Sequence, residues 1–239
     1  MLKIKRRNNL EITLPQNVSY ILNLETATKN CSVAIAKEGK TILCKEMAEA
    51  GYSHAEKLHV FIEECLQELQ LTSKDLSAVA VSQGPGSYTG LRIGVSAAKG
   101  LCFALDIPLI AIDTLQVLAS QVSISEGIII PMIDARRMEV YSAIFNSKLE
   151  KIREVRAEII TEESFIESSE SIHFVGDCSE KAKTVLTNQN FIFHDEMVYP
   201  SAKEMGYLSF KKFLEKDFED VAYFEPYYLK DFMITVSKK

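Results

Sequence analysis

Residues 78–94 read AVAVSQGPGSYTGLRIG, and this stretch decides the fold. Residues 78–82 are small or β-branched, which predicts a short buried strand. A glycine-rich loop follows from Gly84 to Gly90, and the pattern after it predicts a helix that ends near Leu105. A buried strand that passes through such a loop into a helix is typical of an α/β protein.

The glycine-rich loop allows two interpretations. An anion could bind there, because backbone N–H groups and the positive end of the helix dipole would face it. The spacing matches neither the dinucleotide-binding fingerprint nor a P-loop, which needs a lysine after its last glycine. A tight turn is the commoner use of such glycines, so the loop alone does not establish a phosphate site.

The chain before this stretch predicts strands and a helix. Ser53 and Glu56 have capping-box spacing, which predicts a helix that extends to about Gln70. A strand at 109–112 and a helix capped by Asp113 then close a first lobe. Runs of β-favouring residues predict a three-stranded meander at 20–25, 31–37 and 41–47.

The order of strands and helices repeats from Gly127. Strands are predicted at 128–133, 139–145, 151–160 and 172–175, and helices at 161–167, from about 179, and after a capping box at Ser201 and Glu204. The repeat predicts a duplicated, two-lobed α/β fold. We therefore divide the chain into an N-terminal extension (1–19), a first, partner-binding lobe (20–124) and a second lobe (125–239) whose C-terminal helix can pack back on the first.

Composition excludes several classes of protein. The 239 residues are 47% hydrophobic and 25% charged, which is typical of a globular protein. No apolar run approaches the ~20 residues that span a bilayer, and five cysteines without a CxxC pair favour the reducing cytoplasm. A net charge of −6 with dispersed basic residues indicates contact with nucleic acid only through a partner.

The helix after the glycine-rich loop is apolar on nearly every side. Small residues recur every four positions along it, which allows another helix to approach closely. The chain's own preceding helix could supply that cover, and so could another subunit. If a partner supplies it, we expect the contact surface to include Leu58, Phe61, Ile62, Cys65, Arg92, Gly94 and Ala98.

Catalytic residues are harder to find. Glu25 and Asp134 each end a predicted strand, where a kinase-like fold would place carboxylates that bind the metal of a nucleotide, although a carboxylate there more often caps the next turn. His54 and His59 lack the spacing that places two metal ligands on one helical face. The sequence has no HExxH or GxSxG motif, which weakens a hydrolase or peptidase hypothesis.

Four segments of the sequence carry a resemblance to a known family: YILNLETAT at 20–28, HAE at 54–56, QGPGSYTGLRIG at 83–94 and PMIDARR at 131–137. Together they resemble the TsaB family, the dimerisation subunit of the bacterial complex that makes threonylcarbamoyladenosine beside the tRNA anticodon. The resemblance runs from about Tyr20 to the PYYL segment at 226–229. It implies an actin-like, Hsp70-like (ASKHA) fold.

The resemblance also implies partners and a role. The expected partners are the catalytic subunit TsaD, the ATPase TsaE, tRNA through the complex, and a second copy of the chain in a homodimer. No cofactor is expected on this chain, since ATP and metal belong to the partner subunits. Glu25, Thr26, Gly84, Gly86 and Asp134 would be a vestigial nucleotide site.

One departure from the related catalytic subunit decides the expected role. TsaD carries a His-x-x-x-His metal pair where this sequence has Thr114 and Leu118. Neither residue can replace imidazole as a metal ligand, so the resemblance implies no catalytic or metal site here. A second departure is Glu25, where the family usually has aspartate. The alternatives are an ATP-binding kinase-like enzyme or ATPase of the same fold and, with less support, a metal-dependent peptidase.

Overall fold

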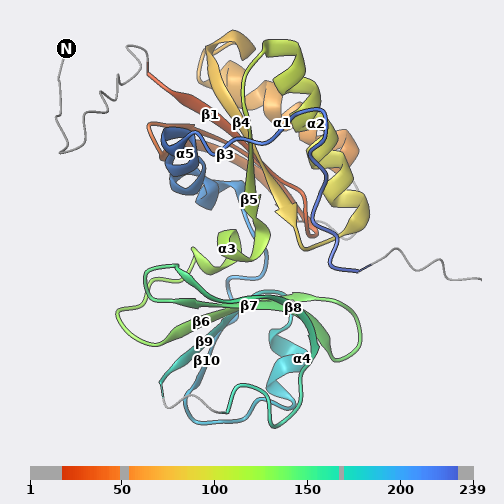
Figure 1. Cartoon of the computed structure of the whole chain (residues 1–239), viewed down its shortest axis with the longest axis vertical. Coiled ribbons are helices and arrows are strands. Elements are labelled where there is room, and N and C mark those ends of the chain that lie inside the picture. The colour runs from red at the N-terminus through yellow and green to blue at the C-terminus, as the bar shows by residue number, and fades with distance from the viewer. Residues whose placement is uncertain (1–17, 49–53, 167–169, 231–239) are drawn as a thin grey trace, which may run out of the picture.

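The computed structural model describes residues 18–48, 54–166 and 170–230 and shows two lobes, one above the other (Figure 1). Each lobe is built on a five-stranded mixed sheet. The first sheet has the spatial order β3-β2-β1-β4-β5, from β1 (Tyr20–Glu25), β2 (Asn30–Lys37), β3 (Lys40–Ala48), β4 (Leu76–Gly84) and β5 (Leu109–Asp113). The second has the order β10-β9-β6-β7-β8, from β6 (Ile128–Asp134), β7 (Glu139–Asn146), β8 (Lys151–Ile159), β9 (Ile172–Val175) and β10 (Phe191–His194).

The two sheets share one topology. In the first, β1, β2 and β3 pair antiparallel as a meander, and β4 and β5 join β1 in parallel. In the second, β6, β7 and β8 form the same meander, and β9 and β10 join β6 in parallel. The predicted duplication is therefore confirmed.

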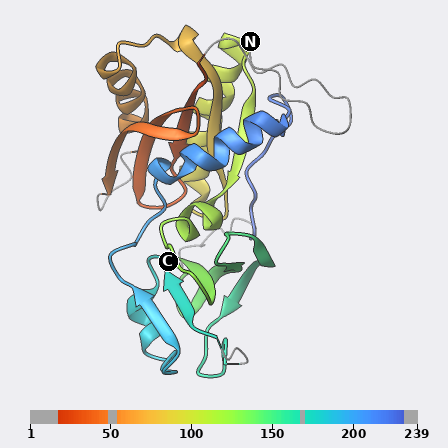
Figure 2. The same cartoon turned by 90° about the vertical axis from the view of Figure 1, so that its left-hand side faces the viewer.

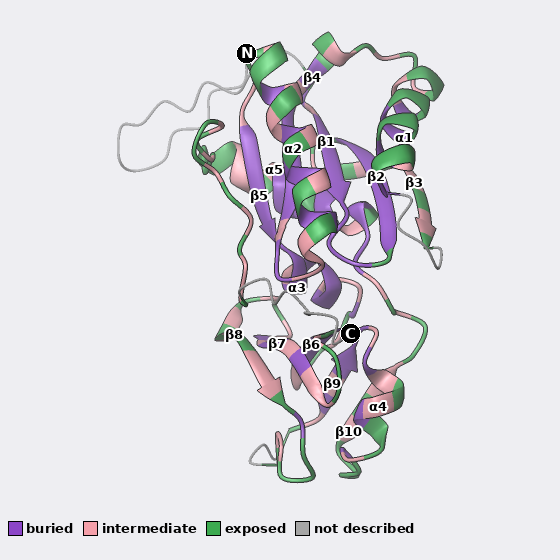
Figure 3. Cartoon of the chain, turned by 90° about the vertical axis from the view of Figure 1, so that its right-hand side faces the viewer, coloured by how far each residue is buried: buried purple, intermediate pink, exposed green. Residues whose placement is uncertain are grey.

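Helices cover both faces of the first sheet. Helices α1 (His54–Glu68) and α2 (Tyr88–Leu105) pack on one face, where Leu22 and Leu24 of β1 point. Helix α5 (Met205–Glu215) packs on the other face (Figure 2). Ile21 of β1 belongs to the core cluster on that side, with Met205 and Leu208. Because both faces are covered, the central strands are buried throughout, as Figure 3 shows.

The second sheet is covered by shorter helices. Helix α3 (Thr114–Ala119) packs on the face toward the first lobe and contributes Leu115 and Leu118 to a core with Phe145. Helix α4 (Ser179–Lys183) lies on the opposite face, where Ala182 packs with Phe174. None of the helices within the described ranges combines the length and apolarity that crossing a membrane requires.

The chain returns to the first lobe after β10. Ser32 Oγ accepts from the Ala202 N–H at 2.8 Å, at the start of a short 3-10 turn (Ala202–Glu204) that leads into α5. Residues 220–230 then run beside α2, where Lys99 Nζ donates to the carbonyl oxygens of Ala222 and Phe224. The first lobe is therefore completed by the C-terminal part of the chain.

One prediction about local structure was wrong, and one strand was not predicted. Residues 162–166 form turns and no helix, and Phe165 has a left-handed φ of 64°, which a right-handed helix does not allow. Strand β10 was not predicted; it is a four-residue edge strand that is only half-buried. The capping residue predicted at 53 and residues 1–17 of the extension predicted at 1–19 lie outside the described residues. A second 3-10 turn (Ser73–Asp75) precedes β4.

Candidate functional site

Glu25 ends β1 and is fully buried. Its Oε1 accepts from the Ala27 N–H at 2.6 Å, and its other carboxylate oxygen is hydrogen-bonded by the Ser82 hydroxyl. Burial raises the pKa of Glu25 to about 7, although both hydrogen bonds act in the opposite direction. All its partners belong to its own lobe, so the carboxylate caps the turn after β1.

The glycine-rich loop is pressed onto that same turn. Ser87 N–H donates to the Ala27 carbonyl oxygen at 2.6 Å, and Thr26 Oγ1 donates to the Gly90 carbonyl at 2.8 Å. A Cβ on Gly86 would lie 2.3 Å from the Ala27 oxygen. These glycines therefore allow two backbone segments to touch, and the Ser87 amide that could face a phosphate is already bonded.

The C-terminal segment covers the loop from the other side. Tyr227 N–H donates to the Gln83 carbonyl at 2.7 Å. Gly84 has a φ of +118°, and a Cβ there would lie 2.5 Å from the Tyr227 carbonyl oxygen. The rings of Tyr88 and Tyr228 lie 4.9 Å apart beside this contact. The chain's own backbone therefore encloses the end of β4.

Thr114 and Leu118 hold structural positions. Both are fully buried on α3. Thr114 Oγ1 accepts from the Gly84 N–H at 3.0 Å, which ties α3 to the glycine-rich loop. Leu118 lies in the core of the second lobe, against Gly176. In the described part of the chain, no group of three or more His, Cys, Asp or Glu side chains is placed to hold a metal ion.

Asp134 ends β6 in the position that Glu25 has on β1, but its environment is open. Its side chain is 46% exposed, forms an ion pair with Lys181, and accepts from the Arg136 N–H at 2.9 Å. Its backbone N–H donates to Asp177. Thr26 and Gly86 thus lie at the turn that Glu25 caps, and Gly84 lies between Thr114 and Tyr227. The interactions of Asp134 are with Lys181, Arg136 and Asp177, all in the second lobe.

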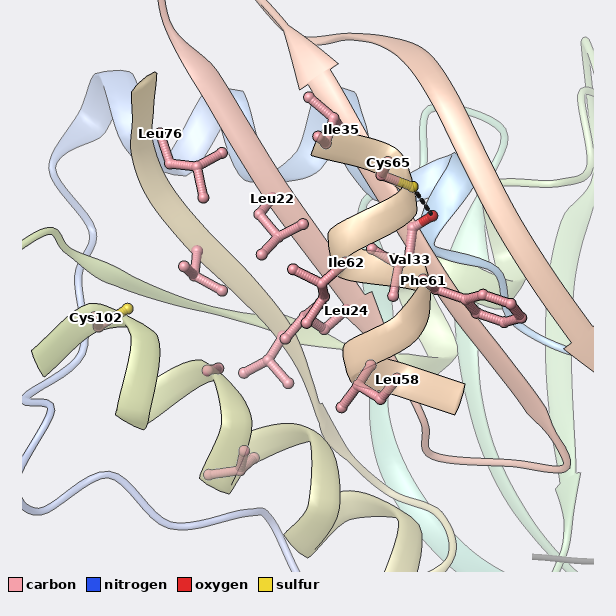
Figure 4. Close-up of a cluster of buried hydrophobic side chains, with 14 of the residues drawn as sticks. Leu22, Leu24, Val33, Ile35, Leu58, Phe61, Ile62, Cys65, Leu76 and Cys102 are labelled. Atoms are coloured by element: carbon pink, nitrogen blue, oxygen red, sulfur yellow. Dashed lines mark hydrogen bonds between the residues drawn. The ribbon is translucent and has the colours of Figure 1, made fainter. Parts of the chain in front are cut away.

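Most side chains expected to contact a partner face into the first lobe. Six of the seven lie in or against the core of the first lobe (Figure 4). A helix on a sheet turns its apolar stripe to that sheet, so the stripe is not free surface. Only Arg92 is exposed, and it stacks over Tyr88 with its Cζ 4.8 Å from the ring centroid. The six buried residues are Leu58, Phe61, Ile62, Cys65, Gly94 and Ala98.

The surface that α1 and α2 do offer lies on the opposite side of each helix. We define the α1–α2 outer face by Val60, Glu63, Ile93, Ser96 and Gly100. Val60 is 45% exposed, and a Cβ on Gly100 would have no neighbour within 4 Å. Sequence reasoning missed this face because it followed the apolar stripe, whereas the residues half a turn away carry the free surface.

The fold and the site together define a class of protein. Two lobes of identical strand order, each with helices on its sheet, are the architecture of the actin-like ATPase fold. The solved structure described as YeaZ from Pseudomonas aeruginosa has this fold, with a TM-score of 0.78 and 24% identity over 88% of this chain and all of that one.

The comparisons of sequence are more specific. A family model described as TsaD, tRNA N6-adenosine threonylcarbamoyltransferase, matches residues 48–236. The tRNA threonylcarbamoyladenosine biosynthesis protein TsaB of Bacillus subtilis is 30% identical, with 88% of this chain and 93% of that protein covered. The TsaB of Escherichia coli is 28% identical, with 88% and 94% covered. The chain therefore belongs to the TsaB family.

Proposed function

We propose that this chain is a non-catalytic subunit in tRNA threonylcarbamoyladenosine biosynthesis, which binds and supports the transferase TsaD. The names of its relatives place the family in this pathway. The α1–α2 outer face would be the contact surface. ATP and metal would be held by TsaD and TsaE, and this chain would need no cofactor of its own.

The non-catalytic role is supported chiefly by the structural positions of Thr114 and Leu118. A metal-dependent transferase would need two imidazoles on this helix. Thr114 instead accepts a backbone hydrogen bond, and Leu118 fills a core. Histidines could not replace them without breaking that hydrogen bond and overfilling that core.

The contacts around Glu25 weigh against the kinase-like or ATPase alternative. A carboxylate that holds the metal of a nucleotide must reach solvent or ligand. Glu25 is fully buried and bonded to Ala27 and Ser82, and the loop amide of Ser87 is engaged by Ala27. The chain's own atoms thus occupy the groups that a phosphate and its metal would need.

The contact surface is tested at Gly100. We expect Gly100→Arg to abolish co-purification with TsaD, because a long charged side chain would stand on a face that must approach another protein closely. Gly100→Ala should retain binding. Tyr207→Arg is the matched control, since Tyr207 is 69% exposed on α5, across the sheet. All three variants should keep the melting temperature of the parent chain within a few degrees.

Unchanged binding of TsaD by Gly100→Arg would contradict the proposed surface. If only Tyr207→Arg lost binding, the result would indicate that TsaD contacts α5 instead. A second copy of this chain is the other expected occupant of the face, and size measurements on the chain alone would detect a homodimer that Gly100→Arg dissociates.

A further inference from the structure

We propose that the turn between β6 and β7 binds the phosphate backbone of RNA through Arg136 and Arg137. The inference rests on the proposed function in one respect only, namely that the complex acts on tRNA. The chemistry that it requires is a strand of phosphodiesters, to which two neighbouring guanidinium groups can donate.

The turn is held firmly by its surroundings. Ala135 N–H donates to the Glu139 carbonyl, and Glu139 N–H donates to the Arg136 carbonyl, both at 3.1 Å. Lys181 Nζ donates to the carbonyl oxygens of Arg137 at 2.9 Å and Glu139 at 2.7 Å. The two arginines are therefore presented from a fixed backbone rather than from a loose loop.

That backbone disfavours the residues it carries. Arg136 has a φ of 75° and Arg137 a φ of 53°, both in the left-handed region where glycine and asparagine are favoured. Two successive side chains of this size in that region are strained. Strain of this kind is typical of positions where the side chain itself is needed.

The exposed positive charge at the turn is that of the two arginines. Asp134 is paired with Lys181, and Glu139 with Lys230. A third carboxylate, Asp177, accepts from the Asp134 N–H. Arg136 and Arg137 are both exposed, and neither has an ion-pair partner among the described residues. Their two guanidinium groups therefore outnumber the one carboxylate near the turn that has no ion pair.

A polyanion fits this arrangement better than a small ligand. The arginines stand on an exposed hairpin turn, and successive phosphates of a strand could meet each of them. The chain as a whole carries a net charge of −6, so a polyanion would approach it only where positive charge is gathered. Lys230, at the end of the described C-terminal segment, lies beside the turn but is paired with Glu139, so Arg136 and Arg137 are the cations that the turn offers to a polyanion.

The test measures how tRNA affinity depends on salt, for the chain alone and for its complex with TsaD and TsaE. The variant Arg136→Gly/Arg137→Asn removes both guanidinium groups and supplies residues that prefer the left-handed region. We expect the slope of log K against log salt to fall in magnitude by between one and two, with about tenfold weaker binding at 0.1 M salt. Its melting temperature should be equal to or above that of the parent.

Two controls make the result specific. Arg136→Lys/Arg137→Lys keeps the charge and should keep most of the slope. Lys37→Ser/Lys40→Ser removes two exposed charges from the turn between β2 and β3 of the first lobe and should leave the slope unchanged. An unchanged slope for Arg136→Gly/Arg137→Asn would overturn the proposal, as would an equal loss for Lys37→Ser/Lys40→Ser.

The result is separable from the proposed function. Assembly with TsaD is read by co-purification, which this turn should not affect. A chain that fails to bind TsaD refutes the proposed function, and the salt slope of the chain alone then still decides the role of the turn. If the complex assembles but its tRNA affinity does not change when Arg136 and Arg137 are replaced, only the proposed RNA-binding role of the turn is refuted.

Discussion

The ends of β1 and β6 occupy the same place in the two copies of one topology, yet they differ in almost every physical respect. Glu25, at the end of β1, is fully buried, and its partners are backbone and a hydroxyl. Asp134, at the end of β6, is about half exposed and is paired with a lysine. The two strand ends are equivalent in topology but differ in what packs over them. We call the buried end of β1 the closed end and the partly exposed end of β6 the open end.

The difference lies in which segments cover each strand end. The glycine-rich loop lies over the turn after β1, and the segment around Tyr227 lies over the end of the neighbouring strand β4. The end of β6 is contacted by the turn that carries Arg136, by the side chain of Lys181 and by Asp177. A closed strand end contributes to stability, whereas an open one remains available to another molecule.

The largest effect on stability is expected at Gly86, where the glycine-rich loop contacts the turn after β1. We expect Gly86→Ala to destabilise the first lobe by about 4 kcal/mol, because the new Cβ would lie 2.3 Å from a backbone oxygen that cannot move freely. Urea unfolding measures it. Gly100→Ala is the control and should stabilise by about 0.5–1 kcal/mol, since it replaces an exposed helical glycine. Equal effects of the two substitutions would show that the loop is not packed as described.

The next effect is a pH dependence of stability that arises from the buried carboxyl of Glu25. The pKa of Glu25 is about 7 in the folded chain, above its ordinary value of 4.5, so the folded state holds an extra proton between these pH values. The free energy of unfolding should therefore fall as pH rises from about 4.5 to about 7, by roughly 3 kcal/mol in total.

Glu25→Gln should remove that fall, since the amide does not titrate. Stability curves for the parent and Glu25→Gln should converge at high pH or cross in favour of the variant. Parallel curves for the parent and Glu25→Gln would contradict the burial of this carboxyl.

A smaller effect is expected at the contact between α3 and the loop. Thr114→Val keeps the shape of the side chain but leaves the buried Gly84 N–H without its acceptor, which should cost about 2 kcal/mol. Thr114→Ser restores the hydroxyl and should recover most of that loss. Hydrogen exchange at the Gly84 amide should accelerate in the valine variant alone; equal protection in both variants would show that the hydrogen bond contributes nothing.

The smallest effect is expected at the open end. Asp134→Asn removes an ion pair with Lys181, but the lysine keeps its two carbonyl acceptors and the site is partly solvated. The free energy of unfolding should change by less than about 0.5 kcal/mol. A loss as large as that of Thr114→Val would mean that the two strand ends are equally structural.

The end of α2 at Leu105 and the meander of the first lobe could be predicted from the sequence because both depend on local patterns, and both are confirmed. The enclosure of Glu25 could not be predicted, since its hydrogen bond with Ser82 joins residues 57 positions apart in the chain. The burial of the expected contact residues could not be predicted for a related reason: periodicity identifies the apolar side of a helix but not what covers it.

The central claim is that this chain lacks the transferase site and yet is needed by the subunit that has it. It is tested most directly by mixing purified chain, TsaD and TsaE with tRNA, ATP, the threonylcarbamoyl donor and metal, and omitting one protein at a time. We predict that modified adenosine forms only when TsaD and this chain are both present. Modification by this chain without TsaD, or full turnover by TsaD and TsaE without this chain, would contradict the claim.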